Sequence, residues 1–185
     1  NSNTLSNNIV GPWAVMSSGT MYATVVNGTV APFRVGSSGS AAQASSLTDQ
    51  TGTVNYVLTG SSGTAGPGFR GNTIRYIGTT GTLSPASGGF VVGGLMNSGG
   101  GTLFVGGTSV ADSNPVTISD TSRELVISST NRGVTFNSAV VEGSGTSSGV
   151  TFLSTGGATL SLFGANSFTG PINVMGGNLT IGGTN

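Results

Sequence analysis

Residues 156–183 read GGATLSLFGANSFTGPINVMGGNLTIGG. The segment contains three short apolar runs, and each run ends at glycine or at a small polar residue. It contains no Lys, Arg, Asp, Glu, His or Cys. Within the runs, apolar residues alternate with Ser, Thr or Asn, as in Leu160-Ser161-Leu162. An alternation of this kind indicates β-strands that have one buried face and one solvated face.

The same alternation recurs along the chain, and no 11-residue window holds an apolar stripe of helical period free of glycine. The sequence therefore predicts an all-β protein. From residue 73 onward we expect short strands of about five residues each. They lie in the segments TIRYIG, GTLSPA, GFVVGG, GTLFVGG, NPVTISD, ELVISS, GVTFNS, GVTFLS, ATLSLFG, PINVMGG and NLTIGG.

The spacing of these strands favours a parallel β-helix. ELVISS begins at position 124, GVTFLS at 149 and PINV at 171, so similar segments return at similar intervals. GVTF itself occurs at 133 and again at 149, and ATLSL at 158 is followed by NLTI at 178. A repeat of about 20–25 residues that holds two or three short strands is typical of a solenoid, in which each coil pairs with its neighbours.

The composition agrees with stacked coils. Glycine, serine and threonine make up 87 of the 185 residues, whereas only ten residues are charged. Small residues permit tight corners, and like charges stacked every ~4.8 Å would repel one another. Disorder of the whole chain is disfavoured, because the net charge is zero and 35% of the residues are hydrophobic.

An antiparallel β-sandwich or barrel is the alternative fold. It requires repeated hairpin turns such as Asn-Gly or Asp-Gly between strands. Only Asn27-Gly28 fits that pattern, so the parallel β-helix is favoured.

The N-terminal part of the chain, up to about position 70, has a different character. It contains Trp13, Tyr22 and Tyr56, and its strand-like segments are more widely spaced. The ranges 37–46 and 60–69 read as loops, because they are rich in Gly, Ser and Ala. We therefore expect one solenoid domain over 1–185, with a loop-rich part over about 1–70 and the clearest repeat over 156–183.

The opening segment resembles the autotransporter-associated β-strand repeat, with the approximate pattern G-x-L-T-L-S-G-x-N-T-Y-x-G-x-T-x-V-N-x-G-x-L-x-I. The match runs over 158–170 and 172–181, with Phe168 in place of Tyr, Pro171 in place of a small residue, and Met175 before the glycine. A looser likeness covers 72–93 and 123–143. The resemblance implies a right-handed parallel β-helix that is exported and displayed at the cell surface.

Motifs of enzymes occur without the residues that their chemistry requires. The range 145–149 matches G-x-S-x-G, but the chain has no histidine to serve as the base of a triad. The range 66–71 matches G-x-G-x-x-G, but a strand follows it where a dinucleotide site needs a helix. Asp120 and Glu124 are the closest pair of acids, and Arg123 between them favours a local salt bridge. We therefore predict no enzymatic activity and no metal or cofactor.

Other classes of function find little support in the sequence. Cysteine is absent, so disulfides are excluded, and no apolar run is long enough for a membrane helix. A net charge of zero leaves no basic patch for nucleic acid. The phenylalanines could stack on a carbohydrate, but Phe104, Phe136 and Phe152 are expected in the core from the phase of their strands.

The two ends of the chain suggest self-assembly. NSNTLSNNIVG at the start and NLTIGGTN at the end both read as strands without a capping segment. Uncapped solenoid coils expose unpaired N–H and C=O groups, which can add a strand from another copy. We expect an extracellular structural protein whose copies join head to tail into a filament. Its candidate interface residues are Leu5, Ile9, Val10, Asn178, Leu179, Thr180 and Ile181.

An adhesin is the alternative function. In that interpretation the chain is a segment of an autotransporter-type passenger, and the loops at 37–46 and 60–69 bind glycans or a host protein.

Overall fold

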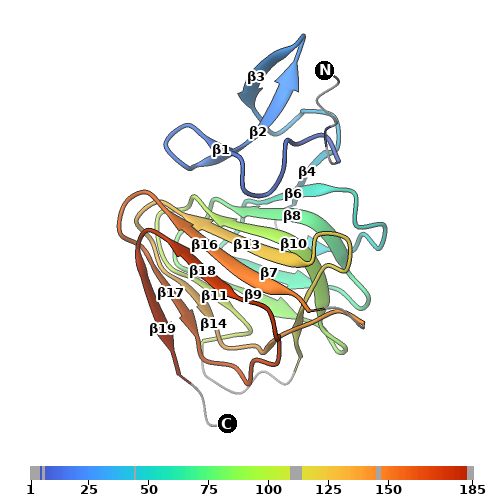
Figure 1. The fold of residues 1–185 in the computed structure, drawn as a ribbon. Coiled ribbons are helices and arrows are strands. Elements are labelled where there is room, and N and C mark those ends of the chain that lie inside the picture. Colours follow the sequence, from blue (N-terminus) through green and yellow to red (C-terminus); the bar gives the residue numbers. More distant parts are fainter. Residues whose placement is uncertain (1–4, 6, 44, 109–113, 145–146, 183–185) are drawn as a thin grey trace.

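The computed structural model describes residues 5, 7–43, 45–108, 114–144 and 147–182 (Figure 1). The described residues form β-strands and no helices, as the alternation predicts. Two sheets of parallel strands face each other, and a small antiparallel unit lies against the outside of one of them.

Each parallel sheet takes one strand from every coil. Sheet 1 runs in the spatial order β4 (Ser40–Gln43), β6 (Asn55–Leu58), β8 (Arg70–Tyr76), β10 (Phe90–Asn97), β13 (Glu124–Ser129), β16 (Gly149–Ser154) and β18 (Ile172–Met175), and β12 (Val116–Ile118) and β15 (Val140–Val141) extend it beside β10. Sheet 2 runs in the order β5 (Ser46–Leu47), β7 (Ser62–Ala65), β9 (Gly81–Pro85), β11 (Leu103–Val105), β14 (Val134–Phe136), β17 (Thr159–Leu162) and β19 (Asn178–Ile181).

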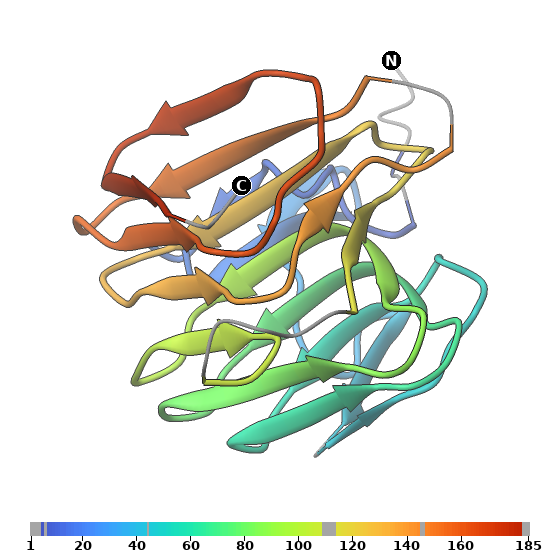
Figure 2. The same cartoon turned by 90° about the horizontal axis from the view of Figure 1, so that it is seen from below.

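The chain winds from one sheet to the other, and every strand pair within these two sheets is parallel. The result is a β-solenoid of about six turns (Figure 2). The predicted parallel β-helix is confirmed, and the sandwich is excluded for these strands, because neighbours in a sandwich run in opposite directions.

Coil lengths follow the predicted period over most of the solenoid. Glu124 pairs with Gly149 and Val150 with Ile172, which reproduces the intervals at which these segments return in the sequence. The coil between β10 and β13 is longer, because the segment from Ile118 to Val126 lies opposite the short segment from Val92 to Gly94. The two GVTF segments do not stack, since β14 belongs to sheet 2 and β16 to sheet 1.

Columns of apolar side chains form the core between the sheets. Residues in register on successive strands pack directly on one another, so each coil depends on the next for burial. One column of sheet 1 contains Ala41, Tyr56, Ile74, Leu95, Ile127, Phe152 and Val174. One column of sheet 2 contains Leu83, Val105, Phe136, Leu162 and Ile181.

Of the three phenylalanines predicted to lie in the core, two are fully buried and one is not. Phe136 and Phe152 are fully buried, as expected. The prediction for Phe104 is wrong, because Leu103 and Val105 on either side of it are the buried residues and Phe104 is only half-buried. The run Leu-Phe-Val is apolar at three consecutive positions, so the alternation alone did not define which of them face inward.

Residues 7–38, here called the N-terminal unit, are the main departure from the expected organisation. They form an antiparallel sheet of β1 (Val15–Met16), β2 (Met21–Val26) and β3 (Thr29–Pro32). Asn27 and Gly28 join β2 to β3 with φ of 49° and 76°, which are the positive angles of a type I′ hairpin turn. The single hairpin signal in the sequence is therefore used.

The first coils of the solenoid contain more strand than the sequence predicts. Strands β4 and β5 lie within the predicted loop 37–46 or extend from it, and β7 lies within the predicted loop 60–69, so both loop predictions are wrong. These strands are rich in Ser, Ala, Gly and Thr, which carry little hydrophobic signal.

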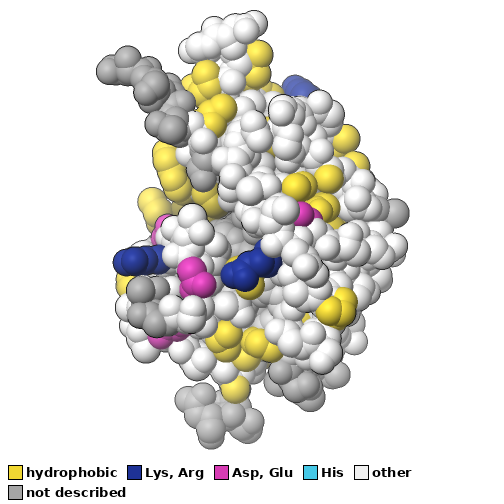
Figure 3. Space-filling view, turned by 90° about the vertical axis from the view of Figure 1, so that its right-hand side faces the viewer, with side chains coloured by type: hydrophobic (Ala, Val, Ile, Leu, Met, Phe, Trp, Pro, Cys, Tyr) yellow, Lys and Arg dark blue, Asp and Glu magenta, His cyan; other side chains and the backbone are white. Residues whose placement is uncertain are grey.

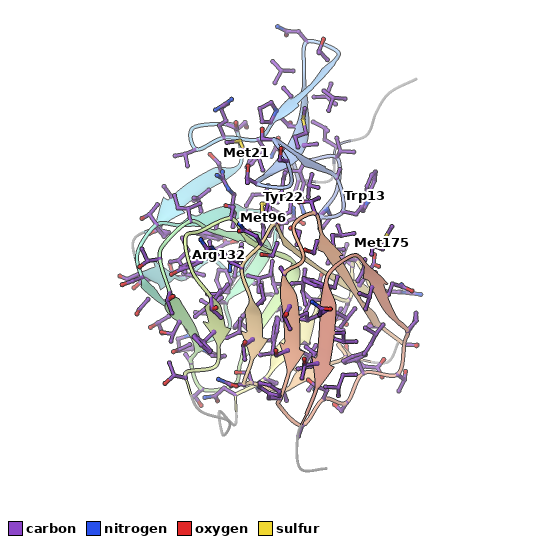
Figure 4. All side chains as sticks on the ribbon, turned by 90° about the vertical axis from the view of Figure 1, so that its left-hand side faces the viewer. Trp13, Met21, Tyr22, Met96, Arg132 and Met175 are labelled. Carbon is purple, nitrogen blue, oxygen red and sulfur yellow. The ribbon has the colours of Figure 1, made fainter. Side chains whose placement is uncertain are left out.

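The N-terminal unit packs across the outer face of sheet 1. Ile9, Tyr22 and Phe33 surround Met96, which points outward from β10 (Figure 4). The Asn55 side chain donates a hydrogen bond to the carbonyl of Asn7 at 2.6 Å. Much of the face that the alternation predicts to be solvated is therefore covered by protein.

Burial of Tyr22 predicts a loss of stability in alkali. Burial raises the pKa of its hydroxyl above the ordinary value, although the positive charge of Arg75 opposes this. The unfolded chain loses this proton near pH 10 and the folded chain does not. The free energy of unfolding should therefore fall above pH ~10, with Tyr22 contributing up to ~1.4 kcal/mol per pH unit.

Urea unfolding between pH 8 and 11 measures how steeply the free energy of unfolding falls with pH. Tyr22→Phe should reduce it, and equal slopes would contradict the assignment.

Candidate functional site

Strands β18 and β19, here called the C-terminal edge, form one end of the solenoid (Figure 1). Within the described residues, β18 pairs only with β16, and β19 pairs only with β17. Four of the predicted interface residues lie here. Asn178, Thr180 and Ile181 are exposed, and Leu179 is half-buried. The backbone groups on the outer side of both strands can therefore pair with a further strand.

The core columns end in exposed side chains at this edge. Val174 is 42% exposed and Ile181 is 63% exposed, whereas Phe152 and Leu162, the preceding members of their columns, are buried. Val174 and Ile181 occupy inward positions that become buried only when another coil is added. Exposed apolar side chains at the end of an unpaired sheet are typical of an association surface.

The other three predicted interface residues do not lie at an edge. Ile9 is fully buried against Met96, and the backbone N–H of Val10 donates to the carbonyl of Ala23 at 2.8 Å. Leu5 is half-buried and lies outside any strand. The prediction failed for Ile9 and Val10 because this segment crosses the outer face of sheet 1, where its apolar side chains are already covered.

Strands β4 and β5 form the opposite end, here called the N-terminal edge. Its inward positions carry small or covered side chains, since Ala41 is half-buried and Leu47 is fully buried. The two ends therefore differ: one presents bulky exposed residues and the other presents small ones.

A shallow groove, here called the Trp13 groove, lies between the N-terminal unit and the last strands of sheet 1. Its lining residues are Trp13, Glu124, Thr151, Leu153, Ile172, Asn173, Val174 and Met175. Trp13 and Met175 are 60% and 64% exposed, and they lie on the same side of the molecule (Figure 4). Large apolar side chains and polar groups thus line one open surface.

No known protein family, curated protein or solved structure matches this chain.

Hydrogen bonds order the polar residues of the Trp13 groove. The hydroxyl of Thr151 donates to Oε1 of Glu124, and the amide of Asn173 donates to that hydroxyl at 3.3 Å. Thr151 is buried, whereas Asn173 is exposed. The three side chains come from β13, β16 and β18, so the row crosses three adjacent strands.

The candidate enzymatic residues are not assembled into a site. The carboxylate of Glu124 accepts a hydrogen bond from Thr151, on the strand beside it. Within the described ranges, no cluster of His, Cys, Asp and Glu could hold a metal ion. Residues 66–69 form a turn that leads into β8, as expected. The G-x-S-x-G range begins outside the described residues.

Figure 3 shows a face dominated by polar uncharged side chains and backbone, with few charged groups. In the part of the chain that the structure describes, no helix is long and apolar enough to cross a membrane.

The sequence analysis did not predict the Trp13 groove. It weighed the phenylalanines as a surface for stacking on a carbohydrate, whereas in the structure Trp13 is the aromatic residue that lies exposed beside polar groups. The available signal was that Trp13 is the sole tryptophan in a chain with few aromatic residues. Its partners lie far along the chain, from Glu124 to Met175, and only the packing of the N-terminal unit brings them together.

Proposed function

We propose that this chain is a non-catalytic structural subunit of an extracellular fibre or surface layer. Copies join when the C-terminal edge of one pairs with the N-terminal edge of the next. The observation that carries the proposal is that the core columns end in the exposed Val174 and Ile181, on strands for which the described residues supply no outer partner.

The register of the sheets defines the contact. Continuing sheet 1 from β18 to the β4 of a second copy places Ala41 in the column of Val174. A small side chain then faces a bulky one, an arrangement that allows close packing. Strand direction is conserved across such a contact, so the joined sheets remain parallel. A head-to-tail contact that does not close produces a filament.

Two further features support assembly outside the cell. The low content of charged residues reduces repulsion between stacked copies. The resemblance of residues 156–183 to a repeat of exported surface proteins supports an extracellular location. The second candidate, an adhesin-type passenger, is favoured by the exposed Trp13 groove.

Charge at the C-terminal edge provides the test of assembly. The unaltered chain should form filaments at tens of micromolar. The double variant Val174→Asp, Ile181→Asp should remain monomeric at the same concentration, because burial of two carboxylates between apolar coils carries a large free-energy cost. Electron microscopy and sedimentation measure the difference.

The matched control is Val30→Asp, which changes a valine of similar exposure on β3, away from both edges. This variant should polymerise normally. Polymerisation of the double variant, or an unaltered chain that stays monomeric, would overturn the proposal.

A further inference from the structure

We infer that the Trp13 groove is a binding site for neutral oligosaccharides. The inference goes beyond the proposed assembly, because Trp13 belongs to the N-terminal unit and the polar residues Glu124 and Asn173 lie outside the core columns, although Ile172 and Val174 of the C-terminal edge complete the lining. It rests on three features of the groove: an exposed indole, a row of hydrogen-bonding side chains, and a lining without a cationic group.

The indole of Trp13 is exposed and lies against Gly11. A Cβ atom at Gly11 would lie 2.5 Å from the indole Nε1, so the ring folds back against the backbone of Gly11. The exposed part of the ring lines the groove. A pyranose ring carries C–H groups on one face, and such a face packs well on an aromatic plane.

The polar row provides partners for hydroxyl groups. The hydrogen bonds among Glu124, Thr151 and Asn173 occupy one carboxylate oxygen of Glu124 and one amide hydrogen of Asn173. The second carboxylate oxygen and the amide oxygen of Asn173 can accept hydrogen bonds from a ligand. A carboxylate accepts from hydroxyls in charge-assisted hydrogen bonds, which are the stronger kind.

The charge of the groove selects the class of ligand. Its lining contains Glu124 and no Lys or Arg, so an acidic sugar would be repelled. A wholly apolar ligand would cover Glu124 and leave its charge unpaired at a large cost. A neutral saccharide satisfies both requirements. The groove crosses β13, β16 and β18 over roughly 10 Å and is open, so it fits an oligosaccharide better than a single ring.

Fluorescence of Trp13 gives a direct assay, because it is the sole tryptophan of the chain. The full chain is titrated with cellotriose, mannotriose and N,N′,N″-triacetylchitotriose, and with trigalacturonate as an acidic probe. At least one neutral trisaccharide should give a saturable change in emission, and trigalacturonate should bind at least tenfold more weakly. The absence of a saturable change with all three neutral probes, or equal binding of the acidic probe, would overturn the inference.

Variants assign the binding to the groove. By calorimetry, Trp13→Ala and Glu124→Gln should each weaken binding about tenfold or more. Gly11→Ala should weaken it by displacing the indole. Val30→Ala, on the distant β3, is the matched control and should leave affinity unchanged. Unchanged affinity in Trp13→Ala would refute the site.

A single variant at the C-terminal edge separates the two proposals. Ile181→Asp places a carboxylate in the proposed polymer contact and changes no residue that lines the Trp13 groove. It should reduce filament formation and still bind the neutral probe with unchanged affinity. Loss of filaments with retained binding supports the two proposals independently. Retained filaments with no binding by the unaltered chain would refute the saccharide site alone.

Discussion

Replacing Gly81 with alanine is expected to destabilise the solenoid by about 3 kcal/mol. A Cβ atom at this position would lie 1.6 Å from the carbonyl oxygen of Ser61, which belongs to the preceding coil. That oxygen accepts a hydrogen bond from the backbone N–H of Thr82. The collision is with backbone, so relief requires the two coils to separate locally and weakens the pairing of β7 with β9.

Gly100→Ala is the matched control. No atom lies within 4 Å of the Cβ position at Gly100, and its φ is not positive. The substitution should therefore leave stability unchanged or raise it by up to ~1 kcal/mol through the unfolded state. Chemical denaturation of the two variants measures the difference. Equal stability of Gly81→Ala and Gly100→Ala would show that the coils do not approach each other as described.

Truncation of Phe136 to alanine is the second large effect, with an expected loss of about 3–5 kcal/mol. Phe136 is fully buried in the column between Val105 and Leu162. Removing its ring leaves a cavity that neighbouring coils cannot fill, because the spacing of the strands is held by backbone hydrogen bonds.

Phe104→Ala provides the comparison within the same sheet. Phe104 pairs with Thr135, next to Phe136, but its side chain is half-buried on the outward phase of β11. Its truncation should cost less than about 1 kcal/mol, which chemical denaturation of both variants measures. If Phe104→Ala proves the more damaging of the two, the inward and outward faces of sheet 2 have been assigned the wrong way round.

The alternation and spacing of the sequence were sufficient to predict the solenoid from residue 73 onward. Val150 and Ile172 stack as their spacing indicated, because every coil must repeat the same inward pattern to bury its neighbours. Two strands of the first coils, β4 and β7, were predicted as loops, because they consist of Ser, Ala, Gly, Thr and Gln and lack the apolar alternation that marks the later strands.

The candidate site was predicted in part for a related reason. Residues 178–181 form the last described strand of sheet 2, as the repeat indicates, and their role in assembly stays a prediction. The placement of Ile9 failed because it depends on contacts with Met96, which is distant in the chain and belongs to the middle of sheet 1. The Trp13 groove has the same long-range origin, so a local pattern could not indicate it.

The edge and the groove assign different tasks to different parts of the chain. The inward residues at the end of the solenoid support addition of another copy. The outward residues near the same end, together with the N-terminal unit, support binding of a ligand. An added strand beside β18 would cover Val174 at one end of the groove, whereas Trp13, Glu124 and Asn173 lie outside the core columns.

Cross-linking between the two ends tests the assembly most directly. The chain has no cysteine, so the double variant Ala41→Cys, Val174→Cys carries only the two introduced thiols. Within one copy these positions are roughly 30 Å apart along the solenoid, too far for an internal disulfide. Mild oxidation should produce a ladder of covalent multimers on non-reducing electrophoresis, reversed by a reductant. Covalent species that stop at monomer or dimer under conditions of assembly would contradict pairing of β18 with β4 between copies.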